Sequence, residues 1–351
     1  MVDTPSLAIG PANYAGQGHA WAKAVERTLH VHADSFARGP VRRGEFAFDV
    51  DRRIPAPIFF APLLRHLRMR RFLRPYTHVA LDGYQTFFQT PARRDLVADA
   101  TFLQEAGFRV ALIAHGSDIR RPDEHLARLE NSYFAEGDEA YVEHHRQLSA
   151  RNHAAADALG LPLFVSTPDL LADQPSATWL PICLDPREVS AEHPVLERPR
   201  PRVLHLPSRR TPPIKGTQYV DPVLRRLHDE GVVEYLSPEG GIPHAEVIAM
   251  VEQADIVIDQ LLAASYGVAA LEALAAGRVV IGHLGDVTRA GMEEAPPIID
   301  ATPSTLDEVV RRVVADRDWA RERAGAGRPF VEQWHDGRRS AAQLAGFLGL
   351  D

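Results

Sequence analysis

The chain has little cysteine: Cys183 is the only one among its 351 residues. A single cysteine excludes an internal disulfide and any zinc site built from several cysteines. The N-terminus carries Asp3 where a signal peptide would be basic, and no apolar run follows it. We therefore expect a protein that works in the reducing cytoplasm.

Positive charge and long apolar runs are also scarce. Lys and Arg number 39 against 47 Asp and Glu, which gives a net charge of −8 at pH 7. Such a chain has no overall positive field to attract nucleic acid, so we expect no nucleic-acid partner. No segment approaches the roughly 18 uninterrupted apolar residues that a membrane-spanning helix needs.

Short apolar runs instead alternate with stretches of helical period, the pattern of βαβ units and parallel sheets. In the first half this pattern predicts strands at residues 7–9, 29–31, 46–48, 78–81, 110–114 and 163–165. In the second half it predicts strands at residues 203–206, 232–236, 254–259, 279–281 and 298–299. We expect an α/β protein with two Rossmann-like, doubly wound domains that face each other across a cleft.

The domain boundary is predicted from composition. Residues 173–202 are rich in proline and charge and carry little periodicity, as is typical of a linker. We predict an N-terminal, acceptor-side domain over residues 1–188 and a C-terminal, nucleotide-binding domain over residues 189–328. A last helix within residues 329–351 is expected to pack back on the first domain.

The strongest cluster of chemistry lies in residues 205–217, HLPSRRTPPIKGT. Ser208, Arg209, Lys215 and Gly216 fall between a strand end and a helix that begins near Thr217. Cations beside a helix N-terminus form a site for a diphosphate, because the backbone N–H groups and the helix dipole add to their charge. The alternative interpretation is a solvated basic loop at a domain edge.

A second motif, within residues 254–282, predicts a strand, a turn containing Tyr266 and Gly267, and an alanine-rich helix. Glu272 lies in that otherwise apolar helix, where a carboxylate needs a partner. The two adjacent hydroxyls of a ribose would supply one. An arginine or a backbone amide elsewhere in the fold would serve equally well.

These two motifs together resemble the retaining glycosyltransferases of family 4, whose two-Rossmann architecture is called GT-B. In that family an Arg after a strand and a later Lys-Gly grip the donor diphosphate, which matches Arg209, Lys215 and Gly216 here. The family's Glu, seven residues, Glu motif ends at Glu272, in the stretch LEALAAG. The resemblance implies that Glu272 holds the donor ribose and that Ser208, Tyr266 and Gly267 lie near the donor.

The first half resembles the same family in two loops. His115 follows the predicted strand at residues 110–114, at the carboxyl end where such sheets bind ligands. Family members often have His-Gly here, which implies that His115 contacts the donor sugar; a core or capping histidine is the alternative. The glycine-bearing loop at residues 10–18 resembles the family's phosphate and acceptor loop, which makes Gly16 and Gln17 candidate donor contacts.

The chain departs from the family motif at its first Glu, because that position is Ala264. We interpret the change as a variation within a subgroup. It also motivates a rival hypothesis, a non-catalytic nucleotide-sugar-binding protein of the same fold. A second rival is a GT-B-fold nucleotide-sugar epimerase, which would need further acid and base carboxylates beside the donor.

Two other patterns invite a functional interpretation. Asp49 and Asp51 spell a D-x-D sequence, the metal motif of a different glycosyltransferase fold, and we attribute it to chance. Residues 62–76 alternate leucines with arginines, as a helix that docks weakly on anionic lipid would, although a core helix with a solvated arginine face is the alternative.

The predicted function is therefore transfer of a sugar from a nucleotide-sugar donor, with retention at the anomeric carbon and without metal or other cofactor. The acceptor is a small molecule, a glycan or a lipid-linked sugar. Acceptor loops vary freely within a fold, so the sequence does not choose between these, and it predicts no oligomeric state.

Overall fold

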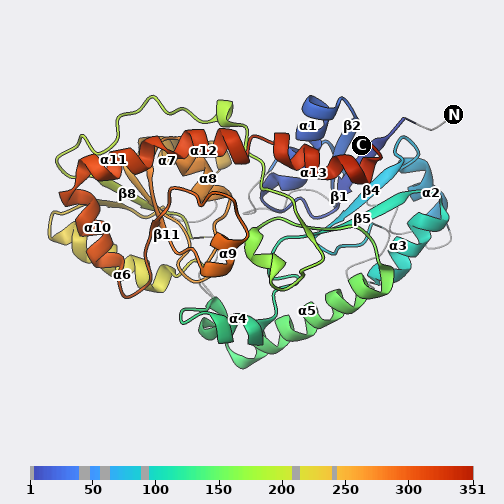
Figure 1. The fold of residues 1–351 in the computed structure, drawn as a ribbon, viewed down its shortest axis with the longest axis horizontal. Coiled ribbons are helices and arrows are strands. Elements are labelled where there is room, and N and C mark those ends of the chain that lie inside the picture. Colours follow the sequence, from blue (N-terminus) through green and yellow to red (C-terminus); the bar gives the residue numbers. More distant parts are fainter. Residues whose placement is uncertain are drawn as a thin grey trace.

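The computed structural model describes residues 4–38, 48–55, 64–87, 95–207, 214–238 and 243–350. These residues form two parallel sheets, one in each half of the chain, each with helices on both faces (Figure 1). The predicted α/β class with two doubly wound sheets is confirmed. Within the described residues, no helix is both long enough and apolar enough to cross a membrane.

The first sheet has seven strands in the order β3-β2-β1-β4-β5-β6-β7. The strands are β1 (Ser6–Gly10), β2 (His32–Arg38), β3 (Arg52–Ile54), β4 (His78–Asp82), β5 (Arg109–Ala114), β6 (Leu163–Val165) and β7 (Thr178–Trp179). The helices of this half are α1 (Gln17–Leu29), α2 (Arg65–Phe72), α3 (Leu96–Glu105), α4 (Pro122–Arg128) and α5 (Glu139–Leu159).

Both faces of this sheet are buried, as the near-continuous apolar runs predict. Ala8 points into a core formed with α2, α3 and α5, whereas its neighbours Leu7 and Ile9 point into a second core formed with α1 and the C-terminal helix α13 (Arg338–Leu348). This two-residue alternation places α1 and α13 on one face of the sheet.

The second sheet has five strands in the order β12-β11-β10-β8-β9. They are β8 (Arg202–His205), β9 (Glu234–Leu236), β10 (Ile256–Ile258), β11 (Val279–Gly282) and β12 (Ile299–Asp300). The helices are α6 (Thr217–Asp229), α7 (His244–Gln253), α8 (Val268–Ala275), α9 (Asp286–Ala290), α10 (Leu306–Ala315), α11 (Arg317–Gly325) and α12 (Gly327–Trp334). Helices α7, α8 and α12 share one core with this sheet, and α6, α10 and α11 share the other.

The chain crosses between the halves twice. The first crossing runs from β7 through residues 181–185, and the second joins α12 to α13, which lies beside α1 (Figure 1). The crossings bond to each other: Leu184 N–H donates to the His335 carbonyl at 2.8 Å, and His335 Nδ1 lies 2.8 Å from the Ile182 carbonyl.

Most predicted strands match observed ones to within two residues at each end, but residues 29–31 do not. Leu29 ends α1, His30 has a positive φ of 55°, and the strand begins only at His32. Residues 46 and 47 of another predicted strand lie outside the described residues. Strands β3 and β7 were not predicted, because one reads Arg-Arg-Ile and the other is two residues within the proline-rich segment.

Candidate functional site

The carboxyl ends of two neighbouring strands bring His115 and Asp82 together. Asp82, the last residue of β4, pairs in register with Ile113 of β5. His115 lies two residues beyond Ile113 and therefore on the same face of the sheet. Its Nε2 bonds to Oδ1 of Asp82, which is fully buried, and the other oxygen of Asp82 accepts Asn13 N–H at 2.6 Å.

Two aromatic rings pack on the His115 imidazole of this pair. Trp21 of α1 stacks on the His115 imidazole with centroids 5.5 Å apart, and Tyr14 meets it edge-on at 5.3 Å. The His115 side chain is 14% exposed. Burial opposes its charge, but the carboxylates of Asp82 and Asp118 outweigh burial and raise the pKa of His115 above its usual value. A protonated imidazole with a small exposed face can donate to, or stabilise, a nearby anion.

Hydrogen bonds and a buried ion pair fix the loop after β5. Asp118 accepts the backbone N–H groups of His115 and Gly116 through its carboxylate. Gly116 has a φ of +150°, and a Cβ there would lie 2.8 Å from Nη1 of Arg120. Arg120 is buried and donates from Nε and Nη2 to Asp169 at 2.9 and 2.7 Å. The loop that carries His115 is therefore fixed by packing and by charge.

The loop after β1 places Gly16 and Gln17 in different surroundings. Gly16 precedes α1 with a φ of +73°, and a Cβ at Gly16 would meet the Phe48 ring at 3.2 Å. The Gln17 side chain is buried, and its amide bonds both the N–H and the carbonyl of Cys183 in the first crossing. Gln17 thus fixes the crossing through both ends of its amide.

In the second half, Lys215 and Gly267 converge on Asp259. Lys215 precedes α6, and its Nζ lies 2.9 Å from Oδ1 of Asp259, just beyond the end of β10. The N–H of Gly267, which caps α8, donates to Oδ2 of the same carboxylate at 3.3 Å. A lysine side chain and the N-terminus of α8 therefore meet at the Asp259 carboxylate, and both are groups that also bind phosphate.

Glu272 has a partner that the sequence did not indicate. Its Oε1 lies 2.6 Å from Nε2 of His244, the first residue of α7. The Glu272 side chain is 4% exposed and that of His244 is 37% exposed. The hydrogen bond and the charge of Glu272 raise the pKa of His244, although burial works in the opposite direction.

Two sets of contacts join the halves near these residues. The His244 ring lies 5.4 Å from the ring of Phe48, which borders Gly16, so the N-terminal loop of the first half adjoins the His244–Glu272 pair. On the other side, Tyr133 N–H donates to the Leu262 carbonyl at 3.2 Å. Leu262 also borders Gly216, where a Cβ would lie 3.3 Å from its Cγ.

Four residues from the sequence analysis remain to be placed. Ser208 and Arg209 lie outside the described residues. Tyr266 is buried, and its hydroxyl lies 3.2 Å from Nε2 of His335, so its side chain belongs to the core and not to a ligand contact. Ala264 has a φ of +53° and is buried, and a Cβ on Gly285 would lie 2.9 Å from its own, so position 264 accommodates a small side chain.

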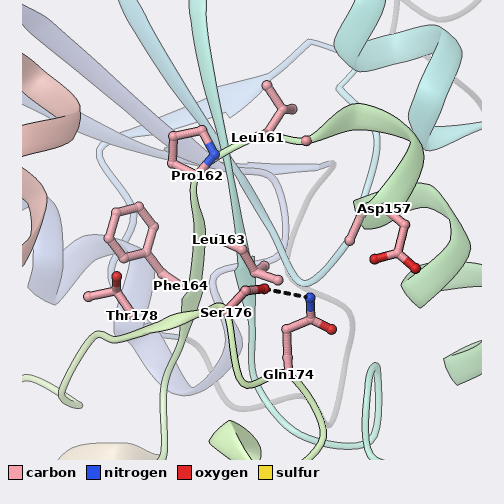
Figure 2. Close-up of a pocket in the computed structure, with 10 residues that line it drawn as sticks. Asp157, Leu161, Pro162, Leu163, Phe164, Gln174, Ser176 and Thr178 are labelled. Atoms are coloured by element: carbon pink, nitrogen blue, oxygen red, sulfur yellow. Dashed lines mark hydrogen bonds between the residues drawn. The ribbon is translucent and has the colours of Figure 1, made fainter.

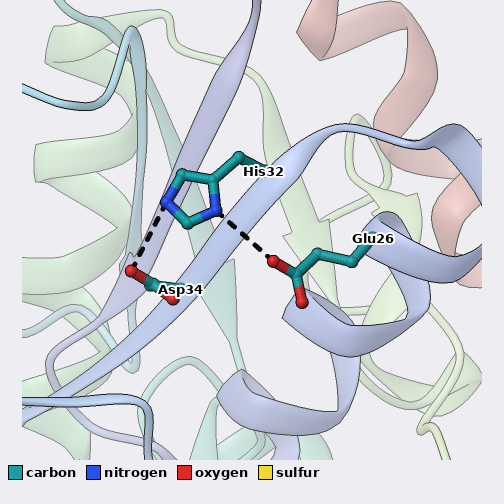
Figure 3. A group of neighbouring side chains, drawn as sticks. All are labelled: Glu26, His32 and Asp34. Atoms are coloured by element: carbon teal, nitrogen blue, oxygen red, sulfur yellow. Dashed lines mark ion pairs between the residues drawn. The ribbon is translucent and has the colours of Figure 1, made fainter.

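A cluster of acidic and basic side chains surrounds His32 in the first half. Figure 3 shows His32 between Glu26 and Asp34, which it meets through different ring nitrogens at 3.4 and 3.6 Å. Lys23 bonds Glu26 at 2.8 Å, and Arg52 bonds Asp34 at 2.9 Å. Glu26, His32 and Asp34 each offer one ligand atom, and these atoms lie within 4.8 Å of one another, but Lys23 and Arg52 bond the same carboxylates.

The D-x-D sequence is divided between two structural roles. Asp51 accepts hydrogen bonds from Ser35 and lies 3.1 and 2.9 Å from His19 and Lys23. Burial opposes its charge, but these donors outweigh burial and hold the pKa of Asp51 well below its usual value. The carbonyl of Asp49 accepts the Asn13 amide at 2.9 Å. Asp51 thus links β2 to α1, whereas the Asp49 backbone supports the loop after β1.

A hollow of about 410 Å³ lies on the first half, between the end of α5 and the start of β6 (Figure 2). Gln174 lines it and donates to Ser176 at 3.2 Å, and the Gln174 side-chain carbonyl oxygen pairs with His153 at 2.8 Å. The hollow borders Leu163, at the amino end of β6, whereas His115 and Asp82 lie at carboxyl ends. It is therefore separate from the candidate site.

Sequence reasoning missed Asp82, His244 and Phe48. Asp82 had a usable signal, since it directly follows the predicted strand at residues 78–81. His244 and Phe48 had none, because each becomes significant only through a residue from another part of the chain.

Comparison with known proteins finds likeness in structure alone: no family model and no curated protein matches the chain. Sucrose-phosphate synthase from Thermosynechococcus elongatus matches with a TM-score of 0.62 and 14% identity over 97% of this chain and 98% of its own. A glycosyltransferase from Rickettsia africae matches with a TM-score of 0.60 and 12% identity over 100% of this chain and 99% of its own. HepE from Anabaena, in complex with UDP-glucose, matches with a TM-score of 0.59 and 12% identity over 98% of this chain and 99% of its own. The chain therefore has the GT-B fold of these glycosyltransferases.

Proposed function

We propose that this protein transfers a sugar from a nucleotide-sugar donor to an acceptor, as a GT-B glycosyltransferase similar to the retaining family 4. The observation that carries the proposal is the meeting of Lys215, which precedes α6, with the N-terminus of α8 at Asp259, at the carboxyl edge of the second sheet. HepE binds UDP and UDP-glucose within the same fold, which supports a donor of that chemical class.

In this proposal the donor diphosphate lies against Lys215, Gly16 and the N–H of Gly267, with Arg209 as a further cation. These groups stabilise the negative charge that grows on the leaving nucleoside diphosphate, which is the main electrostatic task of the reaction. Glu272 accepts the ribose hydroxyls. His115, charged through Asp82, contacts the donor sugar and the departing phosphate.

The reaction itself breaks the bond between the anomeric carbon and the phosphate oxygen and forms a bond from that carbon to the acceptor oxygen. We propose that the acceptor attacks from the face that the phosphate leaves, so that the configuration is retained. The proton of the acceptor hydroxyl passes to the departing phosphate oxygen. The role of the protein is to bind, to orient and to exclude water, without metal or another cofactor.

The acceptor class in this proposal covers a small molecule, a glycan or a lipid-linked sugar in the cytoplasm. Helix α2 supports a weak contact with anionic lipid: Leu64 and Leu67 are exposed beside exposed Arg70 and Arg71, while Met69 is buried. Sedimentation with anionic vesicles tests this contact. We expect the unaltered protein to sediment with anionic vesicles but not with neutral ones, and we expect Leu67→Ser to lose binding to the anionic vesicles.

A thermal-shift screen tests the proposed function directly. The panel contains UDP, GDP, ADP and dTDP with their common sugar conjugates, because a ligand that binds only the folded state raises Tm. We expect a clear shift with one base, and slow release of nucleoside diphosphate from its sugar conjugate. No shift at millimolar concentration would overturn the proposal. Binding without release or transfer, over a range of acceptors, would favour the non-catalytic binding protein.

A further inference from the structure

Glu272 is a buried carboxylate in an apolar helix. Its neighbours Leu271, Ala273 and Leu274 are fully buried, so α8 places the charge in surroundings that do not solvate it. Among the described residues, the hydrogen bond from His244 is the one that reaches this carboxylate, and it is made to Oε1. The orientation of the carboxylate therefore depends on a single side chain from another helix.

His244 is well placed to fix that orientation. It is the first residue of α7, and α7 packs on α8, so the backbone that carries the imidazole is part of the second core. The hydrogen bond is short, at 2.6 Å, and runs between groups that carry opposite charges when His244 is protonated. Either the neutral Nε2–H tautomer or the protonated ring can donate it.

The first half of the chain supports the same imidazole. Phe48 lies 5.4 Å from the His244 ring at a tilt of 55°, and Phe48 also borders Gly16. His244 is thus held between the carboxylate of Glu272 and a ring from the other half. It lies where the predicted phosphate loop adjoins the predicted ribose residue.

We propose that His244 is a positioning residue of the donor site, which holds Oε1 of Glu272 so that Oε2 accepts the two adjacent hydroxyls of a ribose. The inference rests on the proposed function and deepens it, because it makes the chain selective for ribonucleotides. A nucleotide that lacks the 2′-hydroxyl gives up part of the interaction with an oriented carboxylate. Recognition of ribose then depends on a residue that need not touch the ligand.

The experiment compares a ribonucleoside diphosphate with its 2′-deoxy analogue, using the base found by the thermal-shift screen. Dissociation constants are measured by calorimetry for the unaltered protein, His244→Phe and His244→Gln. Phenylalanine keeps a ring against Phe48 but donates nothing, whereas glutamine keeps an N–H donor of similar reach. His32→Phe is the matched control, because His32 also pairs with a glutamate, at 3.4 Å, but lies at the amino end of β2.

We expect His244→Phe to weaken ribonucleotide binding about tenfold, the scale of one hydrogen bond to a charged group, and to leave the deoxy analogue nearly unchanged. His244→Gln should restore most of the preference for ribose, and His32→Phe should keep all of it. An undiminished preference in His244→Phe would overturn the inference while the proposed function stood. If the unaltered protein binds no nucleotide, both fail together.

Discussion

The two halves of the molecule fix their candidate site residues by different means. In the first half, Asp82 ends β4 and His115 directly follows the neighbouring β5, so strand register sets them side by side. In the second half, Asp259 follows a strand and Glu272 lies in a helix, but their partners come from other helices: Lys215 precedes α6 and His244 begins α7. The His115–Asp82 pair is positioned by the sheet, whereas the Lys215–Asp259 and His244–Glu272 pairs depend on how helices pack.

This difference suggests a division of labour. A buried dyad whose His115 ring is packed by Trp21 and Tyr14 is already arranged before any ligand arrives, as a group near the reacting atoms needs to be. Ion pairs at helix N-termini satisfy each other without ligand and can share their charge with a diphosphate when one binds. We expect changes in the first half to affect turnover and changes in the second half to affect donor affinity.

The largest effect is expected for Asp82→Asn. Asp82 accepts from His115 with one oxygen and from Asn13 N–H with the other, and asparagine can accept at only one of these places. Release of nucleoside diphosphate from the sugar nucleotide should slow about 100-fold, while nucleotide affinity stays close to its original value. Steady-state kinetics with calorimetry separates the two quantities.

The control for Asp82→Asn is Asp123→Asn, since Asp123 is an exposed partner of Arg146 on the surface. It should leave both turnover and affinity unchanged. A loss of nucleotide affinity in Asp82→Asn as large as the loss of turnover would contradict the division between the halves.

The next effect is expected for Lys215→Ala, which removes a cation from the proposed diphosphate site and leaves Asp259, 2% exposed, without its ion pair. Affinity for nucleoside diphosphate should fall between about 10- and 100-fold, as for the loss of a hydrogen bond to a charged group. Calorimetry on Lys23→Ala gives the comparison, because Lys23 also pairs with an aspartate, Asp51, but in the first sheet. Equal affinities in both variants would remove Lys215 from the site.

A smaller effect is expected for Gly16→Ala, which adds a Cβ at a φ of +73° and 3.2 Å from the Phe48 ring. The free energy of unfolding should fall by about 1–2 kcal/mol, the cost of a left-handed alanine. Gly267→Ala is its counterpart in the second half: φ is −125° and nothing lies within 4 Å of the added carbon. Its stability should be unchanged, and chemical denaturation of both variants measures the contrast.

The smallest effect concerns pH and the His244–Glu272 pair. The pKa of His244 is raised in the folded state, so the pair adds stability below the unfolded pKa of about 6.5 and loses it as pH rises through the folded value. The difference in Tm between the unaltered protein and His244→Gln should therefore be positive near pH 6 and shrink toward pH 9. A difference in Tm that grows with pH would mean that folding lowers the pKa of His244 instead of raising it.

Much of the fold could be predicted because its signals are local. Runs such as residues 110–114 are apolar without interruption, which a strand buried on both faces requires, and β5 forms there. The segment around Leu29 misled the same reasoning, because a left-handed His30 ends a helix inside an apolar run. Strand β7 is only two residues long, too short to leave a pattern.

The site could be predicted one residue at a time but not as a set. Lys215 and Asp259 are 44 positions apart, His115 and Asp82 are 33 apart, and His244 and Glu272 are 28 apart. Each contact depends on the order of strands and on how helices dock, which no local pattern encodes. For the same reason the burial of Tyr266 and the use of Gln17 by the first crossing became visible only in the fold.

The double crossing of the chain changes what a single break in the backbone would do. Residues 181–185 and His335 bond each other, and α13 buries Leu344 and Leu348 against the first sheet. If a protease cut the linker after Cys183, the first half would stay attached to the second, because α13 would remain packed on the first sheet. The nicked protein should run as one species on a native gel and as two fragments only after denaturation.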